Sequence, residues 1–156
     1  MTGQGVSNVD ALDRDVRLYV FRQAAETSRV PRPGEIAAAF GRPQAEIEES
    51  LRRLGAGRVL ILAPGTTNIW AANPFCAVPS NFRVSALGRT YWGICIWDAL
   101  GIPAALHIDA AITARCSDGC EQEIVLEVRD GALVRSEGIV HFGVPAARWW
   151  ENIGFT

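Results

Sequence analysis

The sequence contains no lysine, and its 15 basic residues, all of them arginine, are set against 17 acidic residues. A net charge of −2 gives the chain no general electrostatic attraction to nucleic acid or to anionic lipid. The sequence also lacks an apolar run approaching the roughly 20 residues of a membrane span, and residues 1–9 lack the features of a signal peptide. We therefore expect a cytoplasmic protein with no membrane or nucleic-acid partner.

Several common catalytic signatures are missing as well. The sequence has no glycine-rich phosphate loop, no Gly-x-Ser-x-Gly elbow and no basic cluster, which excludes nucleotide-binding and hydrolase classes. Its two histidines, His107 and His141, stand alone, and His141 lies in an alternating apolar segment typical of a strand. Four cysteines therefore remain as candidate ligands or nucleophiles, with inert packing as the alternative for each: Cys76, Cys95, Cys116 and Cys120.

The first half of the chain predicts a small helical domain. Hydrophobic residues make up 49% of the sequence, which is enough for one ordinary domain or two small ones. After a frayed tail at residues 1–9, apolar spacing predicts helices at 11–26, 33–41 and 43–55. Strand-like runs at 59–62 and 69–72 follow, joined by a turn rich in glycine, threonine and asparagine. This order is that of a winged-helix domain, with bounds of 10–79.

The third predicted helix is poorly suited to DNA. In a DNA-binding winged helix this element lies in the groove, but here it carries Glu46, Glu48 and Glu49 against Arg52 and Arg53. Carboxylates facing phosphates would be repelled, so a regulator is a weaker alternative than a helical cap that covers a neighbouring site.

The second half, residues 80–156, predicts a β-rich domain. Residues 73–85 contain two prolines and indicate a linker with some extended structure. Strands are expected at 110–116, 120–128, 132–134 and 138–144, with tight turns at 117–119 and 129–131, where Asp-Gly pairs supply left-handed positions. Residues 146–152 predict a short amphipathic helix. The whole chain is therefore predicted to be α+β, with a mixed, mostly antiparallel sheet packed on a central helix.

That central helix is predicted within Tyr91 to His107, an apolar run that contains Cys95 and Asp98. Residues three apart lie on one face of a helix, so the thiol and the carboxylate would share one space. Gly101 is expected to end this helix and Pro103 to begin a second short one. A carboxylate beside a thiol can accept its proton when the thiolate binds a soft metal, and can later return it to a leaving group. The alternative is a core cysteine with Asp98 capping the turn at 101–103.

Two further patterns bear on this site. Trp92 precedes the thiol, Trp97 lies between the thiol and the carboxylate, and Trp149 and Trp150 lie near the end of the chain. All four are candidate walls of an apolar pocket for an organic group, or plain core. Cys116 and Cys120 flank a predicted turn and resemble half of a zinc site, but no second ligand pair accompanies them. We expect two reduced cysteines there.

Residues 95–106, Cys-Ile-Trp-Asp-Ala-Leu-Gly-Ile-Pro-Ala-Ala-Leu, resemble the catalytic segment of the alkylmercury lyases, the organomercurial-cleaving enzymes of mercury resistance. The family also has a winged-helix-like domain before this motif and a cysteine at the end of the next strand, where Cys116 stands. The resemblance implies that Cys95 attacks and holds mercury, that Asp98 delivers a proton to the departing carbon, and that Cys116 is structural. It further implies an organomercurial substrate, no organic cofactor, and an Hg(II) product passed to a reductase.

The chain departs from the family pattern at a second catalytic thiol, which by this alignment falls near or just after residues 154–156. Cys76 and Cys120 are the spare thiols, and neither occupies the matching place. Two interpretations are a truncated or degenerate protein and a codon read as selenocysteine. The alternatives in function are a non-catalytic metal-binding or sensing protein that holds mercury or copper through Cys95 and Cys120, and a winged-helix regulator.

Overall fold

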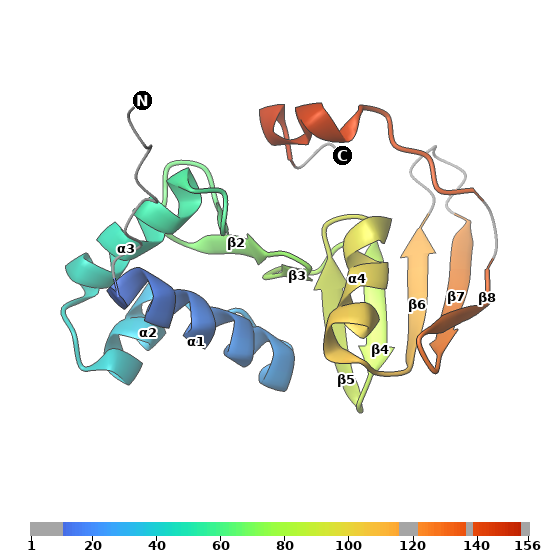
Figure 1. Ribbon diagram of the computed structural model, residues 1–156, viewed down its shortest axis with the longest axis horizontal. Coiled ribbons are helices and arrows are strands. Elements are labelled where there is room, and N and C mark those ends of the chain that lie inside the picture. Colours follow the sequence, from blue (N-terminus) through green and yellow to red (C-terminus); the bar gives the residue numbers. More distant parts are fainter. Residues whose placement is uncertain (1–10, 116–121, 137–138, 154–156) are drawn as a thin grey trace, which may run out of the picture. The chain divides into compact units, whose positions relative to one another are not determined.

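A computed structural model describes residues 11–115, 122–136 and 139–153 of the chain, and its architecture is α+β. Two compact units divide at Ala72 and Asn73 (Figure 1). The predicted tail at residues 1–9 lies outside the described residues. Among the helices that the structure describes, none has both the length and the apolar character needed to cross a membrane.

The first unit consists of three helices and a hairpin. Its elements are α1 (Ala11–Thr27), α2 (Pro33–Phe40), α3 (Gln44–Ala56), β1 (Ile61–Leu62) and β2 (Ile69–Ala72). Pro33 opens α2, and Gly41 ends it with a left-handed φ of 60°. The strands β1 and β2 pair in the antiparallel sense, although β1 begins two residues later than predicted. The apolar stripes of the three helices meet in a core that contains Val16, Val20, Ile36, Ile47 and Leu51.

One polar link crosses this core. Asp13 of α1 is only 5% exposed, and Arg53 of α3 donates two hydrogen bonds to its carboxylate, from Nε at 2.9 Å and from Nη2 at 2.7 Å. These bonds hold the pKa of Asp13 below its ordinary value. A two-pronged bond of this kind fixes the rotation of one helix against the other as well as their separation.

The second unit is an antiparallel sheet with a helix on one face. Its elements are β3 (Phe75–Cys76), β4 (Phe82–Ala86), β5 (Arg89–Gly93), α4 (Ile96–Leu106), β6 (Ala110–Arg115), β7 (Glu123–Arg129), β8 (Ala132–Arg135) and the 3-10 helix η1 (Ala146–Glu151). Five strands pair in the order β5-β4-β6-β7-β8. Every described pair in this sheet is antiparallel, so the predicted mixed character is not observed. In Figure 1, α4 lies across β4 and β5, which it contacts together with β6.

The hairpin β4–β5 corrects the sequence interpretation of this region. Residues 73–85 are predicted to be a linker with some extended structure and the run from Tyr91 to contain the central helix, whereas Phe82 pairs with Gly93 and Val84 with Tyr91 in a hairpin. The turn is Leu87-Gly88, with left-handed φ values of 51° and 68°. A tight hairpin requires such values, but leucine is not a residue that signals them, so the turn escaped detection. The strand β3 contacts β5, which is why the second unit already begins at Asn73.

The helix α4 is one helix, contrary to the expected pair. Gly101 and Pro103 both lie inside it, and its C-terminal cap is His107, with a left-handed φ of 53°. Gly101 serves close packing instead, because a Cβ there would lie 3.2 Å from the Cβ of Pro74. Pro103 removes one helical donor, which a helix buried against a sheet tolerates when packing outweighs the lost bond.

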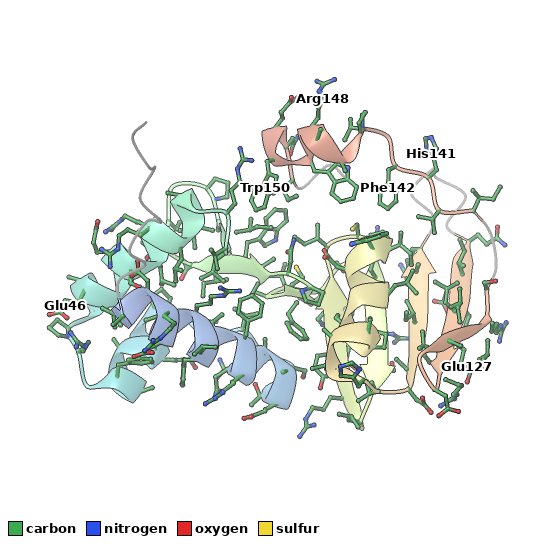
Figure 2. All side chains as sticks on the ribbon, in the orientation of Figure 1. Glu46, Glu127, His141, Phe142, Arg148 and Trp150 are labelled. Carbon is green, nitrogen blue, oxygen red and sulfur yellow. The ribbon has the colours of Figure 1, made fainter. Side chains whose placement is uncertain are left out.

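The end of the chain also differs from prediction. Described residues 139–144 form no strand, and Ile139 is 94% exposed, so the alternating pattern there has no sheet to join. The predicted helix at 146–152 is present as η1, and Figure 2 shows Arg148 and Trp150 on opposite sides of it. Cys116, Cys120 and the turn between them lie outside the described residues.

We expect Asp13→Asn to lower the free energy of unfolding of the first unit by about 2 kcal/mol at neutral pH, since it breaks a buried charge-assisted pair. Because the folded pKa is depressed below 3.8, this contribution is present above about pH 4 and is lost only as the pH falls from there through the folded pKa, where the variant and the parent should converge. Urea unfolding at several pH values measures both effects. Glu46→Gln removes only the exposed pair with Arg42 (Figure 2) and should change stability by less than about 0.5 kcal/mol.

Candidate active site

The candidate site lies where β5 ends and α4 begins. Cys95 is the N-cap residue of α4, with an extended backbone (φ −137°, ψ 179°), and Asp98 lies in the first turn of the helix. The thiol and the carboxylate are therefore a cap residue and a first-turn residue, not two positions on one helical face. The cap geometry nevertheless brings them together: Cys95 Sγ lies 3.9 Å from Asp98 Oδ2, and the two side chains are in hydrogen-bonding contact.

The Asp98 carboxylate also closes the strand-to-helix junction. The backbone N–H of Ile94 donates to Asp98 Oδ2 at 3.2 Å, and the N–H of Ala99 donates to the carbonyl of Cys95 at 3.0 Å. A first-turn acid that accepts from the residues before the helix is the arrangement of a helix cap. The expected alternative, in which Asp98 caps the turn at 101–103, is wrong: its hydrogen bonds are to the start of the helix.

Gly93 permits the close approach of β5 and α4 at this junction. A Cβ at this position would lie 2.7 Å from the backbone N of Ala99 and 3.1 Å from the Cβ of Asp98. Backbone atoms cannot swing aside as a side chain can, so any larger residue must move the helix start. Gly93 thus sets the distance between the strand and the two reactive side chains.

Burial shapes the electrostatics of the pair. Cys95 is 8% exposed and Asp98 is 7% exposed. Loss of water raises the pKa of Asp98 to about 6, against the opposing effect of the hydrogen bonds from Ile94 and Cys95. Burial also raises the pKa of the Cys95 thiol, and the Asp98 charge adds to this, while the N–H groups of Trp97 and Asp98 act in the opposite direction. At neutral pH the pair is a neutral thiol beside a carboxylate that can take up a proton.

A cavity of about 330 Å³ opens onto this pair. Its lining combines a few polar groups with apolar and aromatic side chains: Asn73, Pro74, Ile94, Cys95, Trp97, Asp98, Gly101, Trp149 and Ile153. Trp97 is 64% exposed and stands at the mouth of the site. Trp92, predicted as a second wall, is not among the lining residues; it lies on β5 one position after Tyr91, whose side chain is buried.

Sequence reasoning missed part of this lining. Asn73 and Pro74 were included in a linker, and Ile153 was given no role. No local pattern marks them, because they reach the cavity through the packing of β3 and of the segment after η1. Gly101 was interpreted as a helix end. Its short distance from Pro74 shows instead that the absence of a side chain lets the segment with Pro74 pack against α4.

Cys76 lies nearby in the same unit. It is buried on β3, the strand that contacts β5, and burial followed by the Asp98 charge raises the pKa of its thiol. From the sequence, Cys76 is a spare thiol that does not occupy the place of the second catalytic thiol of the family. Within the described part of the chain, no group of three or more histidine, cysteine or acidic side chains is arranged to hold a metal ion.

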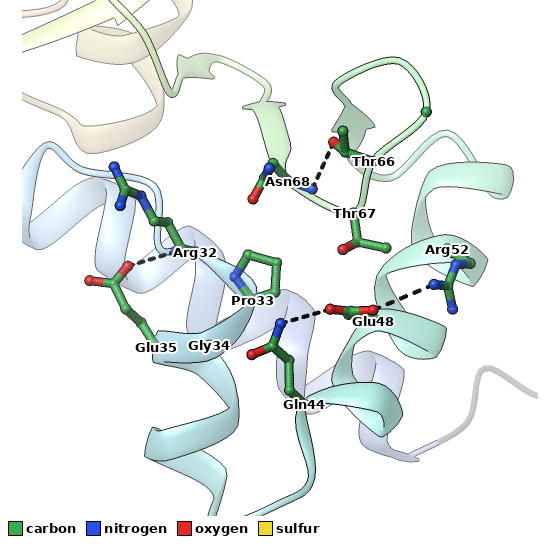
Figure 3. Close-up of a pocket in the computed structure, with 11 residues that line it drawn as sticks. Arg32, Pro33, Gly34, Glu35, Gln44, Glu48, Arg52, Thr66, Thr67 and Asn68 are labelled. Atoms are coloured by element: carbon green, nitrogen blue, oxygen red, sulfur yellow. Dashed lines mark hydrogen bonds and ion pairs between the residues drawn. The ribbon is translucent and has the colours of Figure 1, made fainter.

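The first unit has a larger hollow of about 750 Å³ between the start of α2, α3 and the β1–β2 loop (Figure 3). Its polar groups bond to one another: the Gln44 amide donates from Nε2 to Glu48 Oε1 at 2.7 Å, and Arg52 Nη2 lies 3.5 Å from Oε2 of Glu48. No thiol is among its lining residues, and the one lining group with a shifted pKa is Glu35, whose pKa is lowered by hydrogen bonds from the Arg32 backbone and the Arg29 side chain. The chemistry of the chain is therefore concentrated beside α4.

Comparison with known proteins gives the family of the chain. The family model described as alkylmercury lyase matches residues 75–156, which is more than half of the chain and includes every residue of the Cys95 and Asp98 junction. The chain belongs to the alkylmercury lyase family. The fold is similar to that in the crystal structure of the mercury-bound form of MerB2, with a TM-score of 0.64 and 17% sequence identity. The match covers 84% of this chain and 62% of that chain, so this sequence spans less than two thirds of that protein. No curated protein sequence matches the chain.

We expect the stability gap between Asp98→Asn and the parent to depend on pH. A folded pKa of about 6 against an ordinary value of 3.8 corresponds to about 3 kcal/mol, which favours the folded parent below pH 4 and is lost as the pH rises through 6. The variant should therefore gain about 3 kcal/mol relative to the parent between about pH 4 and pH 8. Urea unfolding followed by tryptophan fluorescence gives this difference, and a gap that stays constant over the range would contradict the buried-acid assignment.

Gly93→Ala should lower the free energy of unfolding of the second unit by about 1–3 kcal/mol, because the new methyl group collides with the start of α4. Thermal unfolding measures the loss. Gly57→Ala is the matched control, since a Cβ there meets its nearest neighbour at 3.4 Å and the backbone φ is −76°, so we expect a change within about 0.5 kcal/mol.

Proposed function

We propose that the protein cleaves the carbon–mercury bond of small organomercurials by protonation, yielding Hg(II) and a hydrocarbon. The observation that carries this proposal is the contact of 3.9 Å between Cys95 Sγ and Asp98 Oδ2 at the floor of a largely apolar cavity. Family membership supports it, because the match includes both residues. Cys95 and Asp98 are the proposed catalytic residues, and the cavity is the proposed place for the organic group.

The first step is capture of mercury by the thiol. The mercury of a cation R–Hg⁺ binds Cys95 Sγ while the S–H bond breaks and the proton passes to Asp98, whose nearer oxygen is already in contact with the sulfur. Mercury(II) is a soft ion and thiolate a soft ligand, so the S–Hg bond replaces the S–H bond readily. A thiol that rests in the neutral form is thus converted to a ligand only when the metal arrives.

The second step returns that proton. The protonated Asp98 donates to the carbon bound to mercury, so the C–Hg bond breaks, a C–H bond forms, and Hg(II) stays on sulfur. A carboxyl group with a pKa of about 6 suits both proton transfers. It is mostly ionised at neutral pH and so can accept the thiol proton, and once protonated it is a far stronger acid than water and so can donate that proton to carbon. The balance is R–Hg⁺ plus one proton giving R–H plus Hg²⁺, and no organic cofactor takes part.

The start of α4 assists the sulfur once mercury is bound. Backbone N–H groups of Trp97 and Asp98 favour the thiolate, and the positive end of the helix dipole lies at the N-cap position that Cys95 occupies. These groups are fixed by the helix and need no rearrangement during the reaction.

A second thiolate on mercury would weaken the C–Hg bond further. Whether such a ligand is supplied distinguishes the lyase from a protein that only binds the metal. Cys95 is the one thiol among the lining residues that the structure describes. If no other thiol reaches bound mercury, the alternative function is a protein that captures mercury or copper at Cys95 and releases no hydrocarbon. Cys116 as a structural cysteine, and Cys120 as a partner of Cys95, remain predictions.

The first unit fits a winged-helix-like interpretation without DNA binding. Its three helices and hairpin follow in the winged-helix order, and α3 carries Glu46, Glu48 and Glu49 near its start. These carboxylates form exposed ion pairs with Arg42 and Arg52, which lie three or four residues away in the sequence. These arginines are therefore already paired with carboxylates, which favours no binding of phosphate. We propose no nucleic-acid partner, a cytoplasmic location, and transfer of the Hg(II) product to a reductase.

The two functions are separated by measuring benzene release and bound mercury after adding phenylmercury. We expect Cys95→Ser to abolish benzene release and the mercury bound at position 95. We expect Asp98→Ala to keep phenylmercury bound at Cys95 but to slow benzene release by at least about 100-fold, the usual contribution of a general acid.

Cys76→Ser is the control thiol, and it should leave capture at Cys95 unchanged, because Cys76 does not line the cavity. Stoichiometric binding without benzene in the parent would assign the protein to metal binding. Full activity in Cys95→Ser would overturn the site itself.

A further inference from the structure

Two tryptophans, Trp97 and Trp149, line the cavity beside the thiol, although they are far apart in the sequence. Trp97 follows Cys95 by two residues, whereas Trp149 comes from η1. We propose that Trp149 is a specificity-determining residue that favours aromatic over small alkyl groups on the mercury of the substrate. This inference rests on the function proposed above and adds to it the chemical class of the organic group.

Trp149 is held in place before any ligand binds. Its indole Nε1–H donates to the backbone carbonyl of Val144 at 3.0 Å, and its ring lies 5.1 Å from the ring of Phe142, tilted by 43°. The hydrogen bond satisfies the one polar group of the indole, and the Phe142 ring supports the indole from a neighbouring segment. A ring fixed in this way loses little conformational freedom when a flat group packs against it.

The size of the cavity suits an aromatic ring together with the metal. Benzene occupies an apolar protein cavity of roughly 150 Å³, and the volume here is about 330 Å³. A methyl group would leave most of this space to water, in contact with indole, proline and isoleucine side chains. A phenyl group would cover the same surfaces and displace that water.

The polar groups of the cavity favour the same orientation. Cys95 and Asp98 are neighbours at the α4 start, so mercury and the carbon to be protonated must lie there. The rest of the organic group then extends toward the remaining lining, of which Trp97, Trp149, Pro74 and Ile153 are apolar. Aromatic rings interact with one another by about 0.5–1.5 kcal/mol beyond the area they bury, which corresponds to roughly two- to tenfold in affinity.

Competition between phenylmercury and methylmercury for Cys95 tests the inference. The parent of this comparison carries Asp98→Ala, because without the proton donor the organomercurial should stay bound at Cys95 and not be cleaved. It receives an equal mixture of the two compounds, and peptide mass spectrometry measures the ratio of adducts on Cys95, with Cys95→Ser identifying adducts on other thiols. Both compounds form the same S–Hg bond, so the ratio reports the organic group. We expect a phenyl preference in the parent that falls about fivefold in Trp149→Ala and is partly kept in Trp149→Phe.

Trp150→Ala is the matched control, because Trp150 is the next residue of η1, is 39% exposed and does not line the cavity. Its ratio should equal that of the parent. An unchanged ratio in Trp149→Ala and Trp149→Phe, or an equal fall in Trp150→Ala, overturns the role of Trp149 while leaving the lyase proposal intact. A parent that forms no adduct on Cys95 with either compound overturns the proposed function and this inference with it.

Discussion

The hydrogen bond from the Ile94 backbone to the buried Asp98 carboxylate is the interaction on which the site depends. It joins the end of β5 to the first turn of α4 and fixes the oxygen that contacts Cys95. Without this hydrogen bond, the Asp98 carboxylate would not be held over the start of its own helix, and the Cys95 thiol would lose its contact with Asp98 Oδ2. The glycine at position 93 makes this closure possible, because it lets backbone approach backbone. Structure and proposed chemistry therefore use the same oxygen atom.

This arrangement carries an energetic conflict that is typical of functional sites. The Asp98 carboxylate is only 7% exposed, and the groups that set its pKa include no basic side chain. Its charge has therefore been removed from water without a compensating positive charge. The buried Asp13 of the first unit shows the contrasting solution, in which an arginine neutralises the charge and the pKa falls. One buried acid stabilises its helices, whereas the other is kept in a state from which a proton is easily gained. The comparison supports a chemical role for Asp98 more strongly than burial alone would.

The sequence predicted the elements with strong periodicity and failed where packing decides. The three helices of the first unit follow from apolar spacing, Pro33 and Gly41, and β6, β7 and β8 were predicted between tight turns, whereas the alternating segment at 139–144 is not a strand. The hairpin at Leu87 was missed because its left-handed turn has no asparagine before the glycine. The helix α4 was divided wrongly because Gly101 and Pro103 have the spacing of a helix end, while their surroundings make them interior residues. For the site, the motif identified Cys95, Asp98 and Trp97, but only the fold adds Asn73, Pro74 and Ile153.

The separation of the cavity walls along the chain has an evolutionary consequence. Cys95 and Asp98, the proposed catalytic pair, belong to a sheet-and-helix junction in which even one added methyl group causes a collision, so this part is closely constrained. The opposite wall belongs to a short 3-10 helix outside the sheet, attached through a segment without regular structure. Such a segment can change its side chains, or its length, without disturbing the junction. Under the proposed function, reactivity and substrate choice are therefore encoded in separable parts of the sequence and are free to diverge at different rates.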